Sequence, residues 1–244
     1  MQDREIINIL LIGQDRRPGE SRARSDSMMI ATINKRNKTV KITSLMRDMY
    51  VQIPGYSDNR INASYAFGGM DLLNATIEKN LLVKIDGNIE VDFDGFQQVI
   101  DNIGGVDIAI NAKEAAHLNK SGFSGLSEGT VTMDGKLALA YGRIRKVGNN
   151  DFERTERQRK VMLAAFQKVK ALSFSEITNL IHVLFPLVNT DLSNNELISL
   201  AYHVFLINPK DIDTYRIPVD NSYQSSWIQG MLVLVPDLTE NREA

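Results

Sequence analysis

The 244-residue sequence contains no cysteine, so disulfide bonds are excluded. It also has no apolar run near the ~20 residues that span a bilayer, because its longest runs, 6–12 and 231–235, have the length of strands. Neither sign of charge dominates: 28 Lys and Arg stand against 30 Asp and Glu, which argues against a wholly basic nucleic-acid-binding protein. The composition leaves a globular protein that is long enough to bury a core without crosslinks.

Several catalytic patterns are missing as well. The sequence has neither a G-x-G-x-x-G pattern nor a Walker loop, so no nucleotide site is indicated. Its histidines, His117, His182 and His203, do not have the spacing of metal ligands. Residues 125–129 fit the pattern G-x-S-x-G, but they lie in a polar stretch without the strand and helix that must flank an exposed serine nucleophile. Serine hydrolase chemistry is therefore disfavoured.

The hydrophobic pattern predicts an α/β protein. Apolar segments bounded by turn residues predict strands at 5–13, 28–33, 40–45, 50–53, 89–93, 106–110, 215–219 and 230–236. Helical spacing predicts helices over 70–82, 96–103 and 151–172, and Ser-x-x-Glu capping boxes at Ser173 and Ser193 predict two more. The polar residues 111–130 predict a surface loop. Because no linker or repeat interrupts the chain, we predict one domain, a central sheet with helices on both faces.

The loop after the first strand carries a first candidate site. Residues 13–29 read GQDRRPGESRARSDSMM and place Asp15 and Asp26 beyond the carboxyl end of a strand, where open α/β sheets bind ligands. Two such carboxylates could share a Mg²⁺ ion, while the arginines between them, Arg17 and Arg24 included, bind phosphate oxygens in pairs. The alternative is a solvated loop whose opposite charges pair with each other.

A second candidate site lies between residues 143 and 160. Seven basic residues stand there against three acids, and they are Arg143, Arg145, Lys146, Arg154, Arg157, Arg159 and Lys160. In an extended segment Arg143 and Arg145 point to one side and Ile144 to the other. This spacing favours two arginines that are directed together. A third arginine, Arg47, precedes Asp48 at the end of a predicted strand, a pattern that alone indicates little.

The helix predicted from residue 151 has a polar face at its start. Asp151, Arg154 and Gln158 are three and four residues apart, so they share one side, and apolar residues continue the same stripe from Val161. A face of this kind has its first turns at a pocket and the rest in the core. The amino-terminal end of the helix also favours an anion. The alternative is an exposed charged helix with ion pairs between successive turns.

Taken in order, these segments resemble the LytR-CpsA-Psr family of cell-envelope phosphotransferases. The matching stretches are GQDRRPGESRARSDSMM, SLMRDMYVQIPG, RINASYAFGG, VDFDGFQQVIDNIGGVDI, LALAYGRIRK and DFERTERQRKV. The resemblance implies one domain over residues 1–244, whose motifs fall within about 5–172 and which residues 173–244 complete. The implied fold is a three-layer α-β-α sandwich around a central mixed β-sheet.

The resemblance also implies an activity. A member of this family transfers a phosphate-linked glycopolymer, a teichoic-acid-like polymer or a capsular polysaccharide, from a polyprenyl-pyrophosphate carrier to peptidoglycan with the help of Mg²⁺. The implied metal-associated carboxylates are Asp15 and Asp26. The implied pyrophosphate and catalytic residues are Arg17, Arg24, Arg47, Arg143, Arg145, Arg154, Asp151 and Gln158. Asp151 would either accept the proton of the acceptor hydroxyl or orient the neighbouring arginines.

One departure from the family concerns the membrane. Its members ordinarily begin with a cytoplasmic tail and a membrane-spanning helix, and neither is found in this sequence. We therefore expect a soluble outer domain that works at the extracytoplasmic face of a bacterial cell membrane, with its anchor missing from this chain.

Three other functions are weighed against this one. A pyrophosphatase or phosphodiesterase would use the same residues with water as the acceptor, and a binding module would only hold the lipid-linked sugar. A nucleic-acid-binding transcriptional attenuator is disfavoured, because acids that repel a phosphate backbone lie between the arginines.

Overall fold

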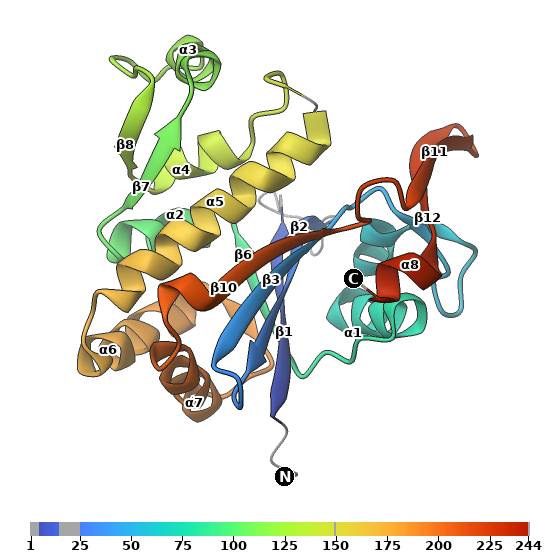
Figure 1. Ribbon diagram of the computed structural model, residues 1–244, viewed down its shortest axis with the longest axis horizontal. Coiled ribbons are helices and arrows are strands. Elements are labelled where there is room, and N and C mark those ends of the chain that lie inside the picture. The colour runs from blue at the N-terminus through green and yellow to red at the C-terminus, as the bar shows by residue number, and fades with distance from the viewer. Residues whose placement is uncertain (1–4, 15–24, 149, 244) are drawn as a thin grey trace. The chain divides into compact units, whose positions relative to one another are not determined.

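The computed structural model describes residues 5–14, 25–148 and 150–243, and at Asp26 and Asn150 it describes the backbone alone. The order of the elements is mixed α/β, as the hydrophobic pattern predicts (Figure 1). The chain contacts define two compact units: the first comprises Met1–Asp92, Thr190–Ser193 and Leu206–Ala244, and the second comprises Phe93–Asn189 and Asn194–Phe205. Asp15, Arg17 and Arg24 lie outside the described residues.

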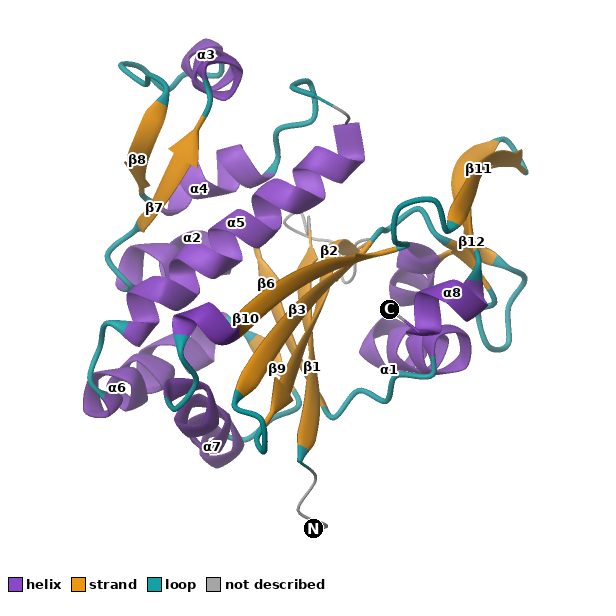
Figure 2. Ribbon diagram, viewed as in Figure 1, coloured by secondary structure: helices purple, strands orange, loops and turns teal. Residues whose placement is uncertain are grey.

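The first unit is built around a mixed sheet of six strands in the order β10-β3-β2-β1-β6-β9 (Figure 2). The long strands are β1 (Ile6–Gln14), β2 (Ser25–Asn34), β3 (Thr39–Leu45), β6 (Gly87–Asp92) and β10 (Ile212–Ile217), and the short edge strand is β9 (Asn189–Thr190). Strand β2 runs antiparallel to β1 and β3, whereas β6 is parallel to β1 and β10 is parallel to β3. The predicted class, a central mixed sheet flanked by helices, is confirmed.

The direction of the strands brings four carboxyl ends to one edge of the sheet. Because β1, β3, β6 and β10 all run the same way, their last residues, Gln14, Leu45, Asp92 and Ile217, lie at this edge together with the first residues of β2. The middle strands are buried on both faces, since Met28, Met29 and Ile30 follow one another in β2 with at most 4% exposure. Such strands read as continuous apolar runs rather than as alternating ones.

The remaining elements of the first unit surround the sheet. They are β4 (Tyr50–Val51), β5 (Asn59–Arg60), α1 (Ile61–Leu81), a short 3₁₀ turn (Pro209–Asp211), β11 (Tyr223–Ile228), β12 (Met231–Pro236) and α8 (Leu238–Glu243). Helix α1 buries Leu73, Ile77 and Leu81, which are spaced four residues apart. It begins nine residues before the predicted start at Met70, because Gly69 adopts a φ of 67° and kinks the helix instead of ending it.

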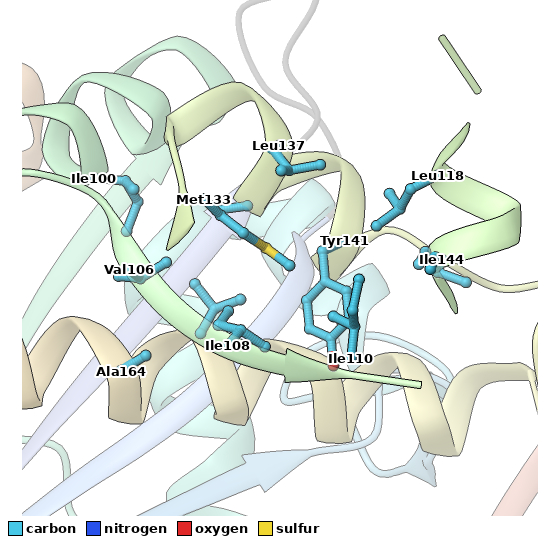
Figure 3. Close-up of a cluster of buried hydrophobic side chains, with 13 residues drawn as sticks. Ile100, Val106, Ile108, Ile110, Leu118, Met133, Leu137, Tyr141, Ile144 and Ala164 are labelled. Atoms are coloured by element: carbon cyan, nitrogen blue, oxygen red, sulfur yellow. The ribbon is translucent and has the colours of Figure 1, made fainter. Parts of the chain in front are cut away.

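The second unit is mainly helical. Its elements are α2 (Phe93–Asn102), β7 (Val106–Ile110), α3 (Ala112–Lys120), β8 (Gly129–Met133), α4 (Gly135–Gly142), α5 (Asn150–Lys170), α6 (Phe174–Leu184), a 3₁₀ turn (Phe185–Leu187) and α7 (Asn194–Phe205). A cluster of buried side chains joins α2, β7, α3, β8, α4 and α5, with Val106, Leu118, Met133 and Tyr141 fully buried within it (Figure 3). This cluster fixes the packing of α4 against α5.

The prediction of a surface loop over 111–130 is wrong for residues 112–120 and 129–130, whereas residues 121–128 form no helix or strand, as predicted. Residues 112–120 form α3, which begins with a capping box in which Asn111 and Glu114 exchange hydrogen bonds between side chain and backbone. The helix is short and polar, and it is held by the burial of Ala115 and Leu118. Two apolar contacts are too few for a periodic signal, so the cap is the feature that predicts this helix.

None of the helices in the described part of the chain is both long and apolar enough to cross a bilayer.

Candidate functional site

The segment that carries Arg143 and Arg145 joins α4 to α5 in the second unit. Arg143 ends α4, and exposure then alternates: Arg143 is exposed, Ile144 is 2% exposed and belongs to the core cluster, and Arg145 is exposed. This is the alternation that the sequence predicts, although Arg143 has helical rather than extended φ and ψ. The buried Ile144 therefore acts as an anchor between two arginines that face solvent.

The guanidinium group of Arg143 lies against an aromatic ring. Its Cζ atom is 4.2 Å from the centroid of the Phe93 ring, at the start of α2. A cation over a ring face is attracted by about 0.5–1 kcal/mol at an exposed site. The stacking restricts where this arginine can point.

The polar face predicted at the start of α5 is present. Arg154 is 4% exposed, and its Nη1 atom lies 2.9 Å from Oδ1 of Asp151, one turn earlier in the helix. Gln158 follows on the same side and lies close to Gly142. If Gly142 carried a Cβ atom, that atom would lie 3.8 Å from the Cγ atom of Gln158. Gly142 immediately precedes Arg143, so Gln158 lies beside the segment that carries the exposed arginines. We call residues 143–148 and the first turns of α5, through Gln158, the arginine corner.

One guanidinium group of the arginine corner, that of Arg157, is buried. The Arg157 side chain is 3% exposed and donates from Nε to Oε1 of Glu114 over 2.7 Å. Its Nη1 atom donates to the Ile144 carbonyl over 3.1 Å, and Nη2 donates to the Val147 carbonyl over 2.9 Å and to Oε2 of Glu153 over 2.8 Å. Arg157 is thus surrounded by acceptors from three parts of the unit. In the sequence Arg157 is one of seven basic residues between 143 and 160, and its spacing alone gives it no role.

Glu114 is buried as well. The Tyr141 ring is fully buried in the same core, and burial raises the pKa of its hydroxyl, with the negative charge of Glu114 as the next cause. Tyr141 is consequently a neutral group at physiological pH. The charge of Glu114 is balanced by the Arg157 guanidinium, as a buried carboxylate requires.

In the first unit, Arg47 and Asp48 follow β3, as the sequence predicts. The Nε atom of Arg47 is 3.7 Å from Oδ2 of Asp48, while Oδ1 of Asp48 is 3.2 Å from Nε of Arg60. Arg60 also donates to the Leu232 carbonyl over 2.7 Å. The side chains of this cluster are 17–24% exposed. Arg60 is not among the predicted site residues, because nothing in its spacing links it to Asp48.

Of the two predicted metal carboxylates, Asp26 falls on the described backbone at the carboxyl edge of the sheet. The backbone of Asp26 falls at a register shift between β1 and β2, where Gly13 pairs with Ser27 and Gln14 pairs with Ser25. Such bulges redirect side chains and are frequent beside active sites. Asp15 follows Gln14 but lies outside the described residues. Among the described residues there is no group of three or more acids or histidines that could hold a metal ion.

The chemistry of this edge nevertheless suits a hard cation. The Gln14 side chain is 2% exposed, and its Oε1 atom finds no hydrogen-bond donor among the described residues. Its amide nitrogen donates to Glu90, which also accepts a hydrogen bond from the Tyr65 hydroxyl. A buried oxygen acceptor next to two aspartate positions matches the oxygen ligands that Mg²⁺ takes.

The predicted site residues are therefore placed as follows. Arg143, Arg145, Asp151, Arg154 and Gln158 belong to the arginine corner of the second unit. Arg47 belongs to the first unit and lies just beyond the carboxyl edge of the sheet, at whose bulge Asp26 falls. Their common participation in one site stays a prediction.

Comparison with known proteins identifies the family. The profile of the LytR_cpsA_psr family matches residues 1–243, so this chain belongs to the LytR-CpsA-Psr family. It is 38% identical over 223 residues to the polyisoprenyl-teichoic acid–peptidoglycan teichoic acid transferase TagU of Bacillus mycoides, a match that covers 88% of this chain and 70% of TagU. It is 33% identical over 221 residues to the regulatory protein MsrR of Staphylococcus aureus, covering 89% of this chain and 66% of MsrR.

A solved structure of the same family shares the fold. The LytR-CPS2A-psr family protein YwtF (TagT), with a bound octaprenyl pyrophosphate lipid, superposes with a TM-score of 0.78 and 27% identity, covering 98% of this chain and 88% of that one.

Proposed function

We propose that this chain is a Mg²⁺-dependent phosphotransferase that links a glycopolymer, teichoic-acid-like or capsular, to peptidoglycan. The donor would be the polymer on a polyprenyl-pyrophosphate carrier, and the reaction would take place at the extracytoplasmic face of the bacterial cell membrane. The relative TagU is named as a teichoic acid transferase, and the solved relative TagT holds a polyprenyl pyrophosphate. Both names support a transferase that acts on this class of lipid.

The observation that carries the proposal is the arginine corner. Arg143 and Arg145 face solvent on either side of the buried Ile144, and the α5 stripe of Asp151, Arg154 and Gln158 lies beside them. A pyrophosphate carries several negative charges, and arginine grips two phosphate oxygens at once while it stays charged. Positive groups fixed in advance stabilise the charge that develops in the transition state, by about 3–4 kcal/mol for each good donor.

The proposed reaction is a phosphoryl transfer. A hydroxyl of the peptidoglycan acceptor attacks the phosphorus that bears the glycan, the bond between the two phosphates breaks, and polyprenyl monophosphate leaves. A phosphodiester then joins the polymer to the acceptor, and the hydroxyl proton passes to a nearby base. In phosphoryl transfer, positioning and charge stabilisation supply most of the catalysis, which is the part that the arginines would play.

Asp151 has two candidate roles, proton acceptor or orienting residue, and its contact with Arg154 bears on the choice between them. Its carboxylate is paired with the buried Arg154 over 2.9 Å, which supports the orienting role more than the role of a free base. Mg²⁺, which Asp15 and Asp26 would hold, would supply charge that neutralises the phosphate oxygens. Arg17, Arg24 and Arg47 are proposed to bind the same pyrophosphate.

The decisive experiment incubates the protein with a short polyprenyl-pyrophosphate glycan and a peptidoglycan fragment, with Mg²⁺ or with EDTA. We expect polyprenyl monophosphate and a glycan–peptidoglycan product, both dependent on Mg²⁺ and both reduced by Arg154→Lys. The control is Lys160→Ala, since Lys160 is an exposed cation on the same helix that pairs with the exposed Glu156. Monophosphate released at full rate without an acceptor would replace the proposal with a pyrophosphatase. Binding of the lipid without any product would replace it with a carrier function.

A further inference from the structure

We propose that Arg157 and Glu114 form a positioning pair, which fixes residues 143–148 and so presents Arg143 and Arg145 to the pyrophosphate. The identity of that ligand rests on the proposed function. The structural part of the inference, that the pair anchors the segment, rests only on contacts within the second unit.

Groups of the protein itself occupy most of the N–H donors of Arg157. A guanidinium group has five N–H donors, and here its three nitrogens reach four acceptors at 2.7–3.1 Å: Glu114, Glu153 and the carbonyls of Ile144 and Val147. The side chain is 3% exposed. A phosphate that approached from solvent would have to displace these partners, so Arg157 acts through its neighbours and does not touch the substrate.

The segment that Arg157 contacts has an irregular backbone. Residues 144–148 form no helix or strand, so their carbonyls must find partners elsewhere when they are buried. Arg157 supplies partners for Ile144 and Val147. The two exposed arginines flank Ile144 directly, so each lies one residue from a carbonyl that is fixed to α5.

Glu114 in turn fixes the position of Arg157. One oxygen of Glu114 accepts from Arg157, and the other accepts from the Asn111 backbone N–H over 3.0 Å in the capping box of α3. Glu114 is 3% exposed and lies 43 residues before Arg157 in the sequence. The start of α3 is thereby tied through two buried side chains to the segment of Arg143 and Arg145.

The consequence for activity follows from preorganisation. Groups held in place before the ligand arrives lose less entropy on binding, and small errors of placement are costly in catalysis. Loosening the pair is expected to reduce affinity for pyrophosphate and the rate of transfer, while the arginines themselves remain in the chain.

The test uses Glu114→Gln and Arg157→Lys in the full chain. Glu114→Gln keeps the shape but removes the charge, and Arg157→Lys keeps the charge but cannot reach all four acceptors. Three quantities are measured well below the unfolding temperature: amide hydrogen exchange over residues 143–148, the affinity for inorganic pyrophosphate by calorimetry, and kcat and KM for transfer. The control is Glu156→Gln, the same chemical change at a carboxylate that is 53% exposed.

We expect both variants to exchange faster over 143–148 and to lose about 10- to 100-fold in pyrophosphate affinity and in kcat. The control should behave like the wild type. If Glu114→Gln does not fold, Arg157→Lys alone decides the matter. Wild-type exchange in both variants, or faster exchange with unchanged affinity and kcat, overturns the positioning pair.

A failure of the proposed function gives a different result. In that case the wild-type protein itself neither binds pyrophosphate nor transfers glycan, and the inference about Arg143 and Arg145 falls with it. When the wild type is active and the two variants match it, only the positioning pair is wrong.

Discussion

Arg157 in the second compact unit and Arg47 and Arg60 in the first differ in how completely the protein buries them. In the second unit the Arg157–Glu114 pair is 3% and 4% exposed, and Arg157 also binds two backbone carbonyls. In the first unit Arg47 and Arg60 share Asp48, and their side chains are 20% and 24% exposed. An exposed pair, Lys168 with Asp107, marks the other limit at 34% and 47%.

This series separates two uses of a cation. A buried ion pair holds elements together, because removal of one partner leaves the other charged in a low dielectric. A partly exposed cation keeps water, or a ligand, within reach. The sequence shows basic residues in all of these places, and only the surroundings of each one decide which use it serves.

The largest effect on stability is expected from Arg157→Met. The substitution leaves Glu114 charged and buried and withdraws the donors from the Ile144 and Val147 carbonyls. Breaking a buried pair in this way costs about 3–5 kcal/mol. Urea unfolding of the wild type and the variant at pH 7 measures the difference. A loss below that of an exposed pair would contradict the interpretation of Arg157 as a structural cation.

Arg143→Ala is expected to have the opposite profile. The side chain is exposed and its guanidinium group lies over the ring of Phe93, so the free energy of unfolding should fall by only about 0.5–1 kcal/mol. Transfer activity should fall by about 100- to 1,000-fold if the group stabilises charge in the transition state. Steady-state kinetics with the lipid-linked glycan measure this, and Lys160→Ala is the control. A large loss of stability with intact kcat would reverse the comparison with Arg157.

The sequence predicts most of the fold because periodic apolar patterns mark the buried elements. Strand β7 covers residues 106–110 as predicted, and α5 covers 150–170 where the pattern indicates 151–172. The pattern fails where burial is slight or the backbone is unusual. Helix α3 buries too few apolar residues to show a period, and α1 continues through the kink at Gly69, so it begins nine residues before the predicted start at Met70.

The candidate site is predictable in part for a similar reason. Local spacing gives the shared face of Asp151 and Arg154, and their ion pair is found. The same spacing puts Arg157 one turn further on, and nothing local distinguishes it from Arg154. What sets it apart is Glu114, a partner 43 residues away that only tertiary packing brings near.

Asp48→Asn tests the intermediate case. Asp48 is 17% exposed and lies between Arg47 and Arg60, so part of the attraction is screened by water. We expect the free energy of unfolding to fall by no more than about 1 kcal/mol. Added NaCl should shrink the difference from the wild type, because salt screens exposed charges. Urea unfolding at low and high salt measures both. A loss as large as that of Arg157→Met would show that exposure does not rank these pairs.

The smallest effect is expected at Asp107. The hydrogen bond from the Thr132 hydroxyl, 2.6 Å long, is the main cause that lowers the pKa of this carboxyl, and Lys168 adds to it. A carboxyl with a lowered folded-state pKa stabilises the fold above its ordinary pKa, and that contribution is lost as the pH falls through the folded-state value. Thr132→Val should therefore raise the pKa of Asp107 toward its ordinary value, with a smaller rise in Lys168→Met.

The measurement is a ¹³C NMR titration of the Asp107 carboxyl in the wild type and both variants. Because the group is exposed, neither substitution should change the stability at pH 7 appreciably. If the pKa of Asp107 is the same in Thr132→Val as in the wild type, the Thr132 hydroxyl does not stabilise the charged form of the carboxyl. A marked loss of stability at pH 7 would mean instead that an exposed pair can act as Arg157 and Glu114 do, and burial would no longer explain the difference between these ion pairs.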